Sequence, residues 1–596
     1  MENFEEGLAL RKEGRIELRE YQIKIAESIL KKGNTLVVMP TALGKTFVAV
    51  LIMAKMLQEM KEGKRENRKF LFLTPTKPLA TQQAERITEL VDFGGEKEGE
   101  VEGKVEAEKK DEIESKVETE KEGGKEEGTE GIDKGNGEIE QISDVVVLTG
   151  EKKPKEREKI WQDERVKVVC ATPQTVEYDL LAGRMELEKF ALVVFDEAHR
   201  VVKDYSYSFL ARESAKLQHV MLIGLTASPS SKKETIDEIC KNMSVKNIEI
   251  RDENDSDVKE FTNKVRVEWK FVDLPDEIVG LKERLEEMLK EVLTQLKDGG
   301  AIERVDLKRH KRELLNLRGK LLKGPIAPES YRLLSWHAKA MNLSHALNLV
   351  ESQGPGTLLK FLQDLETRKK KSKAVRELGE DFRIKMLIEK CRELATRVEH
   401  PKFKILKKIV LEEVDKEKKV IVFSHYRETV KKIVEELNGF AGIRAVEFVG
   451  KSSGGLSQKK QQQALQEFRD GKTNVLVATS VAEEGLDIPS VDLVVFFEPV
   501  PSEIRFIQRR GRVGRAREGR AIILITKGSS DEGFFWSSKS KERKMKELLV
   551  EMKRDMGNEK VKDDEEKGLE KEKNKGDFGE RSVLHSIKQK NISDFA

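Results

Sequence analysis

The chain has 596 residues, enough for about three or four domains, and 37% of them are charged while only 6% are aromatic. Lysine plus arginine (112) nearly balances aspartate plus glutamate (109), so the overall charge does not indicate a nucleic-acid-binding protein, and any basic surface must be local. The three cysteines are far apart and show no C-x-x-C spacing, which argues against a zinc motif or a disulfide framework. The acidic N-terminus does not resemble a signal peptide and the apolar runs are only strand-length, so we expect a cytoplasmic, nucleoid-associated protein without a membrane span.

Strand-like runs alternate with helical patterns from residue 15 to about 230, which predicts a parallel sheet covered by helices. The expected strands are 35–39, 70–74, 145–149, 166–171, 191–195 and 220–225. Residues 95–140 interrupt this pattern, because they contain no aromatic residue, nine glycines and an excess of acidic side chains. We interpret them as a disordered insertion in a surface loop; a long solvated helix is the alternative, which the glycines disfavour.

The first expected strand leads into Pro40-Thr41-Ala42-Leu43-Gly44-Lys45-Thr46, which has the character of a phosphate-binding loop. Gly44 would turn backbone amides toward phosphate oxygens, Lys45 would reach the β- and γ-phosphates, and the Thr46 hydroxyl would ligate Mg²⁺. Met39 occupies the place of the first glycine in the strict G-x-x-x-x-G-K-[ST] pattern. Taken alone, the segment could therefore be an ordinary turn between a strand and a helix.

The apolar run Val193-Val194-Phe195 ends at two adjacent carboxylates, Asp196 and Glu197. A buried parallel strand can end in this way at a site that handles a metal-bound phosphate, although a solvated acidic turn is the alternative. Asp196 would hold Mg²⁺, and Glu197 would orient and deprotonate the attacking water. Together with the loop at Lys45, the pair predicts ATP and Mg²⁺ as cofactors.

From residue 276 to about 394 the apolar positions follow helical spacing, which predicts a helical subdomain inserted between two α/β halves. Its basic stretch 368–373 could contact phosphates or could be a solvated helix end. Strand-like runs return at 420–423, 444–448, 475–478, 493–497 and 521–525, and 265–271 alternates as an edge strand of this second sheet would. The last forty or so residues are rich in charge, and we expect them to be mobile.

The second half offers residues that could complete the nucleotide site. Arg512 and Arg515 are three positions apart, so on a helix they share a face and could reach the γ-phosphate across a cleft. A generic basic helix is the alternative. The segment 478–489 follows a strand, and its Thr, Gly and Asp could contact a nucleic-acid phosphate and the ATP ribose; a plain loop is the alternative.

With these residues in view, residues 15–545 resemble superfamily 2 helicases in the order and spacing of their motifs. The resemblance implies two RecA-like α/β domains, with Gln22 reading adenine, Thr41, Gly44, Lys45 and Thr46 in the phosphate loop, and Thr226-Ala227-Ser228 coupling hydrolysis to domain closure. It implies nucleic-acid contacts by Thr76, Lys77 and Pro78, by Thr172, Pro173 and Gln174, and by Ser424 and Thr479. It also places Gly485, Asp487, Gln508, Arg512 and Arg515 at the nucleotide.

The closer resemblance is to the archaeal Hef helicases, relatives of the Fanconi anaemia M-type translocases and, more distantly, of RIG-I-like receptors and Dicer. It is based on the 76–79 and 196–200 motifs, on 483–487, and on the helical insertion. It implies ATP-driven 3′→5′ movement on branched DNA, with the insertion gripping duplex. The expected domains are 1–260, then 261–275 with 396–545, the insertion 276–395 and a flexible tail 546–596. Hef-type chains usually continue into a nuclease. Glu542-Arg543-Lys544 resembles the core of that nuclease, but its upstream acidic partner is missing, so we interpret the segment as a charged helix and predict no nuclease activity.

The final residues suggest a partner. Gln589, Ile592 and Phe595 have the spacing of the peptide that binds the sliding clamp PCNA, although the second aromatic residue of that pattern is absent. An ordinary mobile tail is the alternative.

The leading hypothesis is an ATP-dependent DNA helicase or translocase that acts on branched DNA in repair and fork processing. The same motor could act on RNA, which a comparison of ATPase stimulation by forked DNA and duplex RNA would distinguish. A non-catalytic scaffold is the third hypothesis, and a measurable nucleic-acid-dependent ATPase rate would exclude it.

Overall fold

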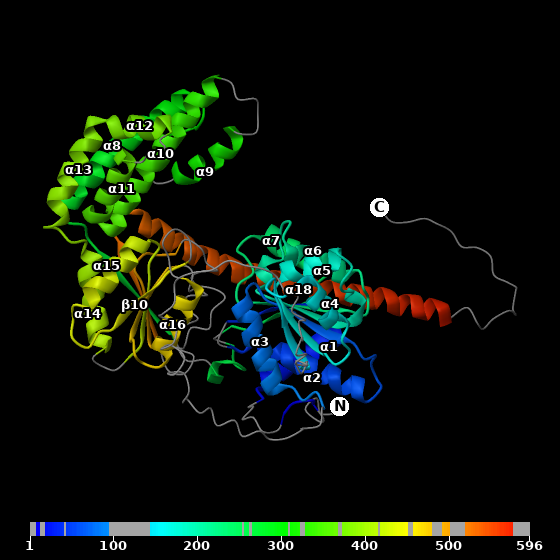
Figure 1. Cartoon of the computed structure of the whole chain (residues 1–596). Coiled ribbons are helices and arrows are strands. Elements are labelled where there is room, and N and C mark those ends of the chain that lie inside the picture. The colour runs from blue at the N-terminus through cyan, green and yellow to red at the C-terminus, as the bar shows by residue number, and fades with distance from the viewer. Residues whose placement is uncertain are drawn as a thin grey trace, which may run out of the picture.

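The protein forms two α/β domains, a helical domain and one long C-terminal helix (Figure 1). The computed structural model describes residues 8–11, 18–40, 43–94, 143–252, 255–261, 265–307, 310–321, 328–367, 372–414, 418–450, 457–479, 491–500 and 519–575. The insertion at 95–140 and the basic stretch up to residue 371 lie outside these ranges.

The first domain is built on a seven-stranded sheet in which every strand is parallel to its neighbours. Its order is β3 (Val145–Leu148), β4 (Val168–Ala171), β2 (Lys69–Leu73), β5 (Phe190–Asp196), β6 (Met221–Thr226), β1 (Thr35–Val38) and β7 (Asn247–Ile250). The six expected strands are confirmed with small differences at their ends. The seventh strand, β7, was not predicted, because its alternating polar residues do not form an apolar run.

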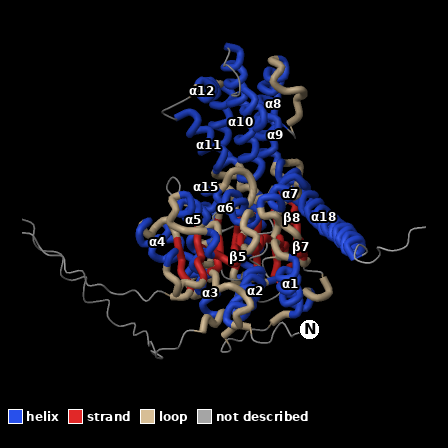
Figure 2. Tube along the Cα trace, turned by 90° about the vertical axis from the view of Figure 1, so that its right-hand side faces the viewer, coloured by secondary structure: helices blue, strands red, loops and turns tan. Residues whose placement is uncertain are grey.

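Helices cover both faces of this sheet (Figures 1 and 2). One face carries α1 (Glu20–Lys32), α2 (Lys45–Lys61) and α3 (Lys77–Leu90), and the other carries α4 (Pro154–Gln162), α5 (Pro173–Leu181), α6 (Ser206–Ala215) and α7 (Lys233–Asn242). Two separate apolar clusters fill the two layers between helices and sheet. Because all strands run the same way, the loops that follow them meet at one edge of the sheet, where the predicted motifs lie.

The second domain has a six-stranded parallel sheet. The order is β10 (Ala445–Phe448), β11 (Val475–Ala478), β9 (Val420–Phe423), β12 (Leu493–Phe496), β13 (Gly519–Thr526) and β8 (Val265–Val272), with helices α14 (Pro401–Val414), α15 (Arg427–Leu437) and α16 (Gln458–Arg469). The prediction that 265–271 forms an edge strand of the second sheet is confirmed. The chain thus begins this domain with β8, leaves it for the helical domain, and returns to it at α14.

The helical domain lies above the second domain in Figure 1. It consists of α8 (Asp276–Asp298), α9 (His310–Leu321), α10 (Pro328–Gln353), α11 (Pro355–Thr367), α12 (Lys373–Glu380) and α13 (Phe382–Ala395), which share one apolar core. The leucine stripe of α8 is buried in that core, as the helical spacing predicted. Among the described residues, none of the helices combines the length and apolar character that a bilayer crossing requires.

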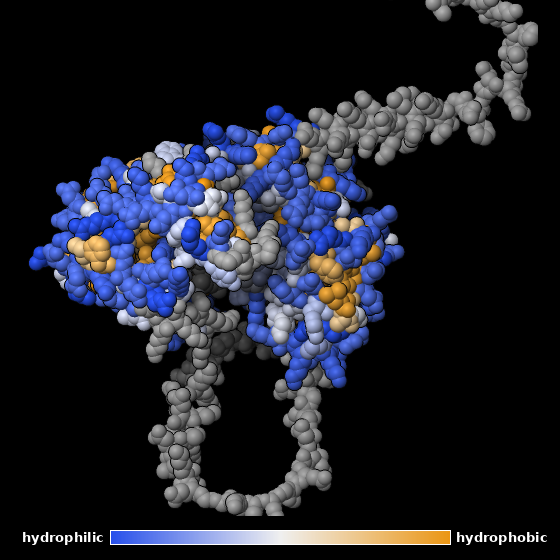
Figure 3. Space-filling model, turned by 90° about the horizontal axis from the view of Figure 1, so that it is seen from above, coloured by the Kyte–Doolittle hydropathy of each residue, from blue (hydrophilic) through white to orange (hydrophobic). Residues whose placement is uncertain are grey.

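The last helix, α18 (Ser530–Lys575), connects the two α/β domains. Near its start Phe535 packs in the core of the second domain, whereas Met545, Leu549 and Met552 are buried in the core of the first. Here the structure differs from the flexible tail expected from residue 546. The reason is that these three residues recur at i, i+4 and i+7, which places them on one helix face inside a charge-rich sequence. Elsewhere the visible surface is mostly hydrophilic (Figure 3).

Candidate nucleotide and nucleic-acid site

The phosphate loop begins where β1 ends and leads directly into α2. Gly44 caps α2 in the left-handed conformation (φ 70°, ψ 45°), which favours glycine, and a Cβ atom there would lie 2.8 Å from Nε2 of Gln22 and displace that side chain. Lys45 is the first residue of α2 and is buried, and its Nζ donates to the carbonyl of Met39 at 3.1 Å. Thr46 follows in the first helical turn, while Thr41 lies outside the described residues.

The acidic pair stands at the end of β5, whose seven residues are all buried. Glu197 adopts a left-handed conformation (φ 53°, ψ 51°), and its amide donates to Oδ1 of Asp196 at 3.0 Å. A non-glycine residue held in this conformation marks backbone strain, which persists only where the surrounding structure enforces it.

Burial, and then the neighbouring charge of Glu197, raises the pKa of Asp196 to about 7. Burial also acts to raise the pKa of Glu197, but the hydrogen bond and charge of His199 and the charge of Lys45 bring that pKa below its ordinary value. The charge of Lys45 lowers the pKa of both carboxyl groups. The phosphate loop and the acidic pair are therefore close enough to form one site.

The side chains at this site fit Mg²⁺ and a nucleoside triphosphate. A buried carboxylate with a raised pKa is an unfavourable charge that a divalent cation would stabilise. Mg²⁺ is usually bound by one or two carboxylates together with substrate phosphates, and the described part of the chain holds no cluster of three or more protein ligands. Asp196 and Thr46 are the residues that would hold the metal, which would neutralise phosphate charge.

The start of α1 packs against the phosphate loop. Gln22 is buried, and its Nε2 donates to the carbonyl of Leu43 at 3.2 Å; the hydroxyl of Tyr21 donates to the same carbonyl at 2.9 Å. The start of α1 thus fixes the backbone of the phosphate loop. The role of Tyr21 was missed in the sequence, where the tyrosine is visible only as the neighbour of Gln22.

His199 connects the acidic pair to the next strand of the sheet. Its Nδ1 lies 3.3 Å from Oε2 of Glu197 and 3.5 Å from Oγ1 of Thr226, and the Thr226 hydroxyl also accepts from the amide of Ser228 at 3.2 Å. Thr226 and Ser228 are both buried. These contacts connect the end of β5 to the loop after β6.

The expected nucleic-acid residues of the first domain lie at the starts of α3 and α5. Thr76 and Thr172 are the N-cap residues, followed by Lys77 and Pro78 in α3 and by Pro173 and the exposed Gln174 in α5. The preceding strands β2 and β4 are neighbours, and the amide of Thr74 donates to the carbonyl of Ala171 at 3.0 Å. Both helix starts therefore share one edge of the sheet, where backbone amides can bind phosphates.

The expected residues of the second domain are less completely placed. Ser424 is fully buried and donates to Oε1 of Glu498 at 3.1 Å. Thr479 is buried at the end of β11. The following residues lie outside the described part of the chain: Gly485, Asp487, Gln508, Arg512, Arg515, Gln589, Ile592 and Phe595.

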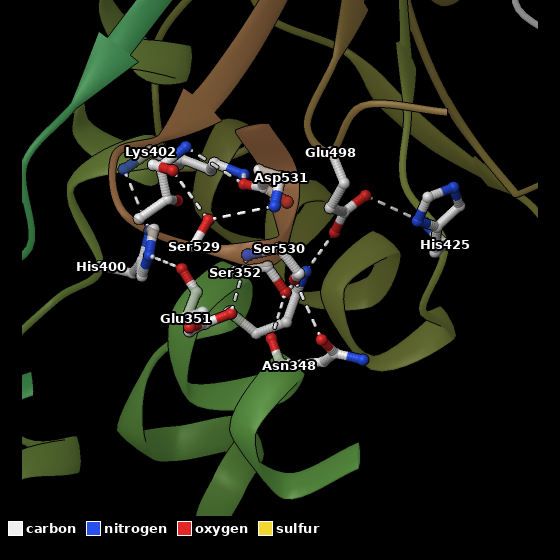
Figure 4. Close-up of polar contacts among 12 residues, drawn as sticks. Asn348, Glu351, Ser352, His400, Lys402, His425, Glu498, Ser529, Ser530 and Asp531 are labelled. Atoms are coloured by element: carbon white, nitrogen blue, oxygen red, sulfur yellow. Dashed lines mark hydrogen bonds and ion pairs between the residues drawn. The ribbon is translucent and has the colours of Figure 1, made fainter. Parts of the chain in front are cut away.

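A buried polar network joins the helical domain to the second domain (Figure 4). Glu498 accepts from Ser424 and from the amide of His425 at 3.0 Å, and Gln353 at the end of α10 donates to the same carboxylate. Burial raises the pKa of Glu498, and the positive charge of Lys402 partly offsets this rise.

A second set of polar contacts lies beside those of Glu498. Glu351 accepts from the amide of Ser530 at 3.1 Å, Ser530 donates to Asn348 at 3.0 Å, and Lys402 pairs with Asp531 at 2.5 Å. Sequence reasoning missed this network, although Glu498 follows the apolar run of β12 as Asp196 follows that of β5. The helical domain and the second domain are thereby fixed to one another.

Three protein families match the chain. "Type III restriction enzyme, res subunit" matches residues 15–231, "Helicase conserved C-terminal domain" matches 401–517, and "Putative ATP-dependent RNA helicase, helical bundle" matches 278–397. The matched ranges correspond to the first α/β domain, the second and the helical domain.

Similar proteins support the same classification. The crystal structure of the Pyrococcus furiosus Hef helicase domain is 40% identical, with a TM-score of 0.60, and the match covers 87% of this chain and 98% of that one. A "Putative ATP-dependent RNA helicase" of Methanocaldococcus jannaschii is 36% identical over 90% of this chain and 61% of its own length. The ATP-dependent DNA helicase mph1 of Neurospora crassa is 30% identical over 87% and 42%, and a mouse Fanconi anemia group M protein homolog is 28% identical over 88% and 25%. The chain thus spans about 25–61% of the length of these curated relatives.

Proposed function

Because the chain belongs to the superfamily 2 helicases, close to the Hef and Fanconi anaemia M proteins, we propose that it moves on branched or forked DNA during repair and replication-fork processing. It is an ATP-dependent helicase, since the second domain matches a conserved helicase domain and the relatives are named as ATP-dependent helicases. The proposal of DNA as the substrate is supported by the relatives that are named as DNA helicases and as Fanconi anaemia group M proteins.

The observation that carries the proposal is the meeting of Lys45, Asp196 and Glu197 at the carboxyl edge of the first sheet. Lys45 would bind the β- and γ-phosphates, Asp196 would hold Mg²⁺, and Glu197, with its lowered pKa, would take a proton from the attacking water. Arg512 and Arg515 are proposed to reach the γ-phosphate from the second domain, with Gln508 beside them. Closure of the cleft would then complete the site, and hydrolysis would reopen it.

On the nucleic-acid side, the proposal rests on the shared edge of α3 and α5. Their N-terminal amides, with Thr76, Lys77, Thr172 and Gln174, would bind backbone phosphates. Phosphate contacts carry little sequence information, so we expect weak sequence preference and strong salt dependence. Binding of a sliding clamp through Gln589, Ile592 and Phe595 remains a separate prediction.

RNA is the second candidate substrate, because one relative and the family of the helical domain are named for RNA helicases. ATPase rates measured with forked DNA, four-way DNA, single-stranded DNA and duplex RNA at equal phosphate concentration distinguish the two. Stronger stimulation by duplex RNA than by any DNA would replace DNA in the proposal.

The test of the site is Glu197→Gln, which keeps the size of the side chain and removes the base. We expect this variant to bind ATP with wild-type affinity while its nucleic-acid-stimulated hydrolysis falls by about 10²-fold or more, within the usual range for a general base. Glu186→Gln, on the exposed segment before β5, is the matched control and should hydrolyse ATP normally. Normal turnover by Glu197→Gln would refute the assignment.

A further inference from the structure

Tyr207, in the first turn of α6, is a buried residue that lies outside every motif considered above. Its side chain is packed against Phe195, with ring centroids 6.0 Å apart, and the residue is 4% exposed. Its hydroxyl donates to the backbone carbonyl of Asp196 at 2.9 Å, and the carbonyl of Leu73 lies 3.5 Å from the same oxygen. A phenol on α6 thus contacts the ends of two strands, β5 and β2.

The contact with Asp196 concerns one particular peptide group. The carbonyl of Asp196 belongs to the peptide bond that leads into Glu197, the residue held at φ 53° and ψ 51°. Rotation of this peptide group would change φ of Glu197 and swing its carboxylate away from the water that it must orient. A left-handed residue other than glycine needs its neighbours to hold it. The Tyr207 hydroxyl is a group placed to do so.

The contact with Leu73 concerns the nucleic-acid side. Leu73 ends β2, the next residue Thr74 donates to Ala171 at the end of β4, and α3 and α5 begin shortly after these strands. The hydroxyl has one proton for two carbonyl acceptors. Any movement of the end of β2 relative to β5 therefore alters how firmly Tyr207 holds the Asp196–Glu197 peptide.

We propose that Tyr207 is a positioning residue that fixes the peptide group before Glu197 and makes its orientation depend on nucleic acid bound at the ends of β2 and β4. This inference rests on the proposed function, in which Glu197 activates water. It adds to it a physical connection between the nucleic-acid edge and the hydrolytic carboxylate within the first domain.

Tyr207→Phe tests the inference, because it removes the hydroxyl and keeps the ring that packs on Phe195. We expect kcat with saturating forked DNA to fall about tenfold, as for a lost oriented hydrogen bond, while KM for ATP and the affinity for a fluorescent ATP analogue stay within about twofold. The ratio of DNA-stimulated to basal rate should fall as well. Tyr205→Phe, two residues earlier and 58% exposed, should leave all these values unchanged.

A second measurement separates positioning from general damage to the fold. If Tyr207 acts through Glu197, adding Tyr207→Phe to Glu197→Gln should cause no further loss of rate, since the carboxylate that it positions is already absent. A full additional tenfold loss in this background, or a wild-type kcat and stimulation ratio in the single variant, would overturn the inference. A rise in KM for ATP that matches the fall in kcat would also overturn it. Absence of nucleic-acid-stimulated hydrolysis in the wild-type protein would instead reject the proposed function itself.

Discussion

The pair Lys402–Asp531 offers a quantitative test of how α14 is held to the start of α18 in the second domain, next to the contacts of Ser530 with the helical domain. The Lys402 side chain is 0% exposed and the Asp531 side chain 4% exposed, and Nζ lies 2.5 Å from Oδ2. Asp531 also accepts from the amide of Thr526 at 3.1 Å, so it connects the end of β13 to α14. Asp531→Ala would leave a buried ammonium group without its partner.

The cost of such an unpaired buried charge is about 3–5 kcal/mol. We expect the low end, about 3 kcal/mol, because Glu498 lies near enough for the Lys402 charge to lower its pKa and would partly compensate. The double variant Lys402→Met/Asp531→Leu removes both charges and should be within about 1 kcal/mol of wild type, since apolar replacement of a buried ion pair is often close to neutral. The single variants Lys402→Met and Asp531→Leu, together with this double variant and the wild type, form a complete double-mutant cycle.

Urea unfolding followed by tryptophan fluorescence is a suitable assay, because Trp269 and Trp536 lie beside Phe535 in the second domain. With a slope of about 2 kcal/mol per molar urea, a loss of about 3 kcal/mol lowers the midpoint of the second-domain transition by about 1.5 M. A midpoint within about 0.5 M of wild type for Asp531→Ala would refute the reasoning. So would a double variant as unstable as the sum of both single changes, because it would show that the two charges do not interact.

Two further predictions concern the nucleotide loop and the junction between domains. Gly44→Ala should weaken binding of a fluorescent ATP analogue at least about tenfold, because the new Cβ atom would meet Gln22 and the left-handed φ would be strained. Gly63→Ala is the control, since Gly63 has a similar φ of 71° and no atom within 4 Å of the added Cβ, and it should bind the analogue normally. Equal affinities of the two variants would contradict this prediction. His400 donates to the carbonyl of Glu351 at 2.9 Å and accepts from the amide of Lys402 at 3.3 Å, and burial, then the charge of Lys402, lowers its pKa to about 3. Below pH about 6.5 the imidazole of His400 is protonated in the unfolded chain but still neutral in the folded protein. The free energy of unfolding should therefore fall as pH drops from about 6.5 toward 3, more steeply than in His400→Gln. Parallel urea midpoints for both proteins across this range would refute the assignment.

The elements that the sequence predicted well are those whose signal is local. Buried parallel strands such as β5 are continuous apolar runs, and the residues that act on phosphate follow them directly, as Asp196 follows Phe195. β7 escaped prediction because its buried polar residue Glu249 accepts a hydrogen bond from Ser28 of α1, a partner that only the tertiary structure brings close.

Other features depend on contacts between distant segments, which no local pattern records. Tyr207 is an ordinary tyrosine in the sequence, and its role arises from two strand ends that meet at its hydroxyl. Ser424 matches a nucleic-acid motif, yet Glu498, 74 residues later, draws its hydroxyl inward. The few apolar residues of α18 lie among many charged ones, so the packing of this helix on the first domain could not be predicted from the sequence.

The course of α18 limits how the two α/β domains can move relative to one another. The domains are joined once by the chain between β7 and β8 and a second time by α18, which starts in the second domain and is buried in the first through Met545, Leu549 and Met552. Lys546 and Lys553 add ion pairs to Asp252 and Glu249 at the end of the first connection, so the two tethers are themselves linked. Two bodies tethered at two places can turn about the axis through those places but cannot drift apart. A change in the relative orientation of the two domains must therefore either be a rotation about that axis or detach α18 from the apolar core of the first domain.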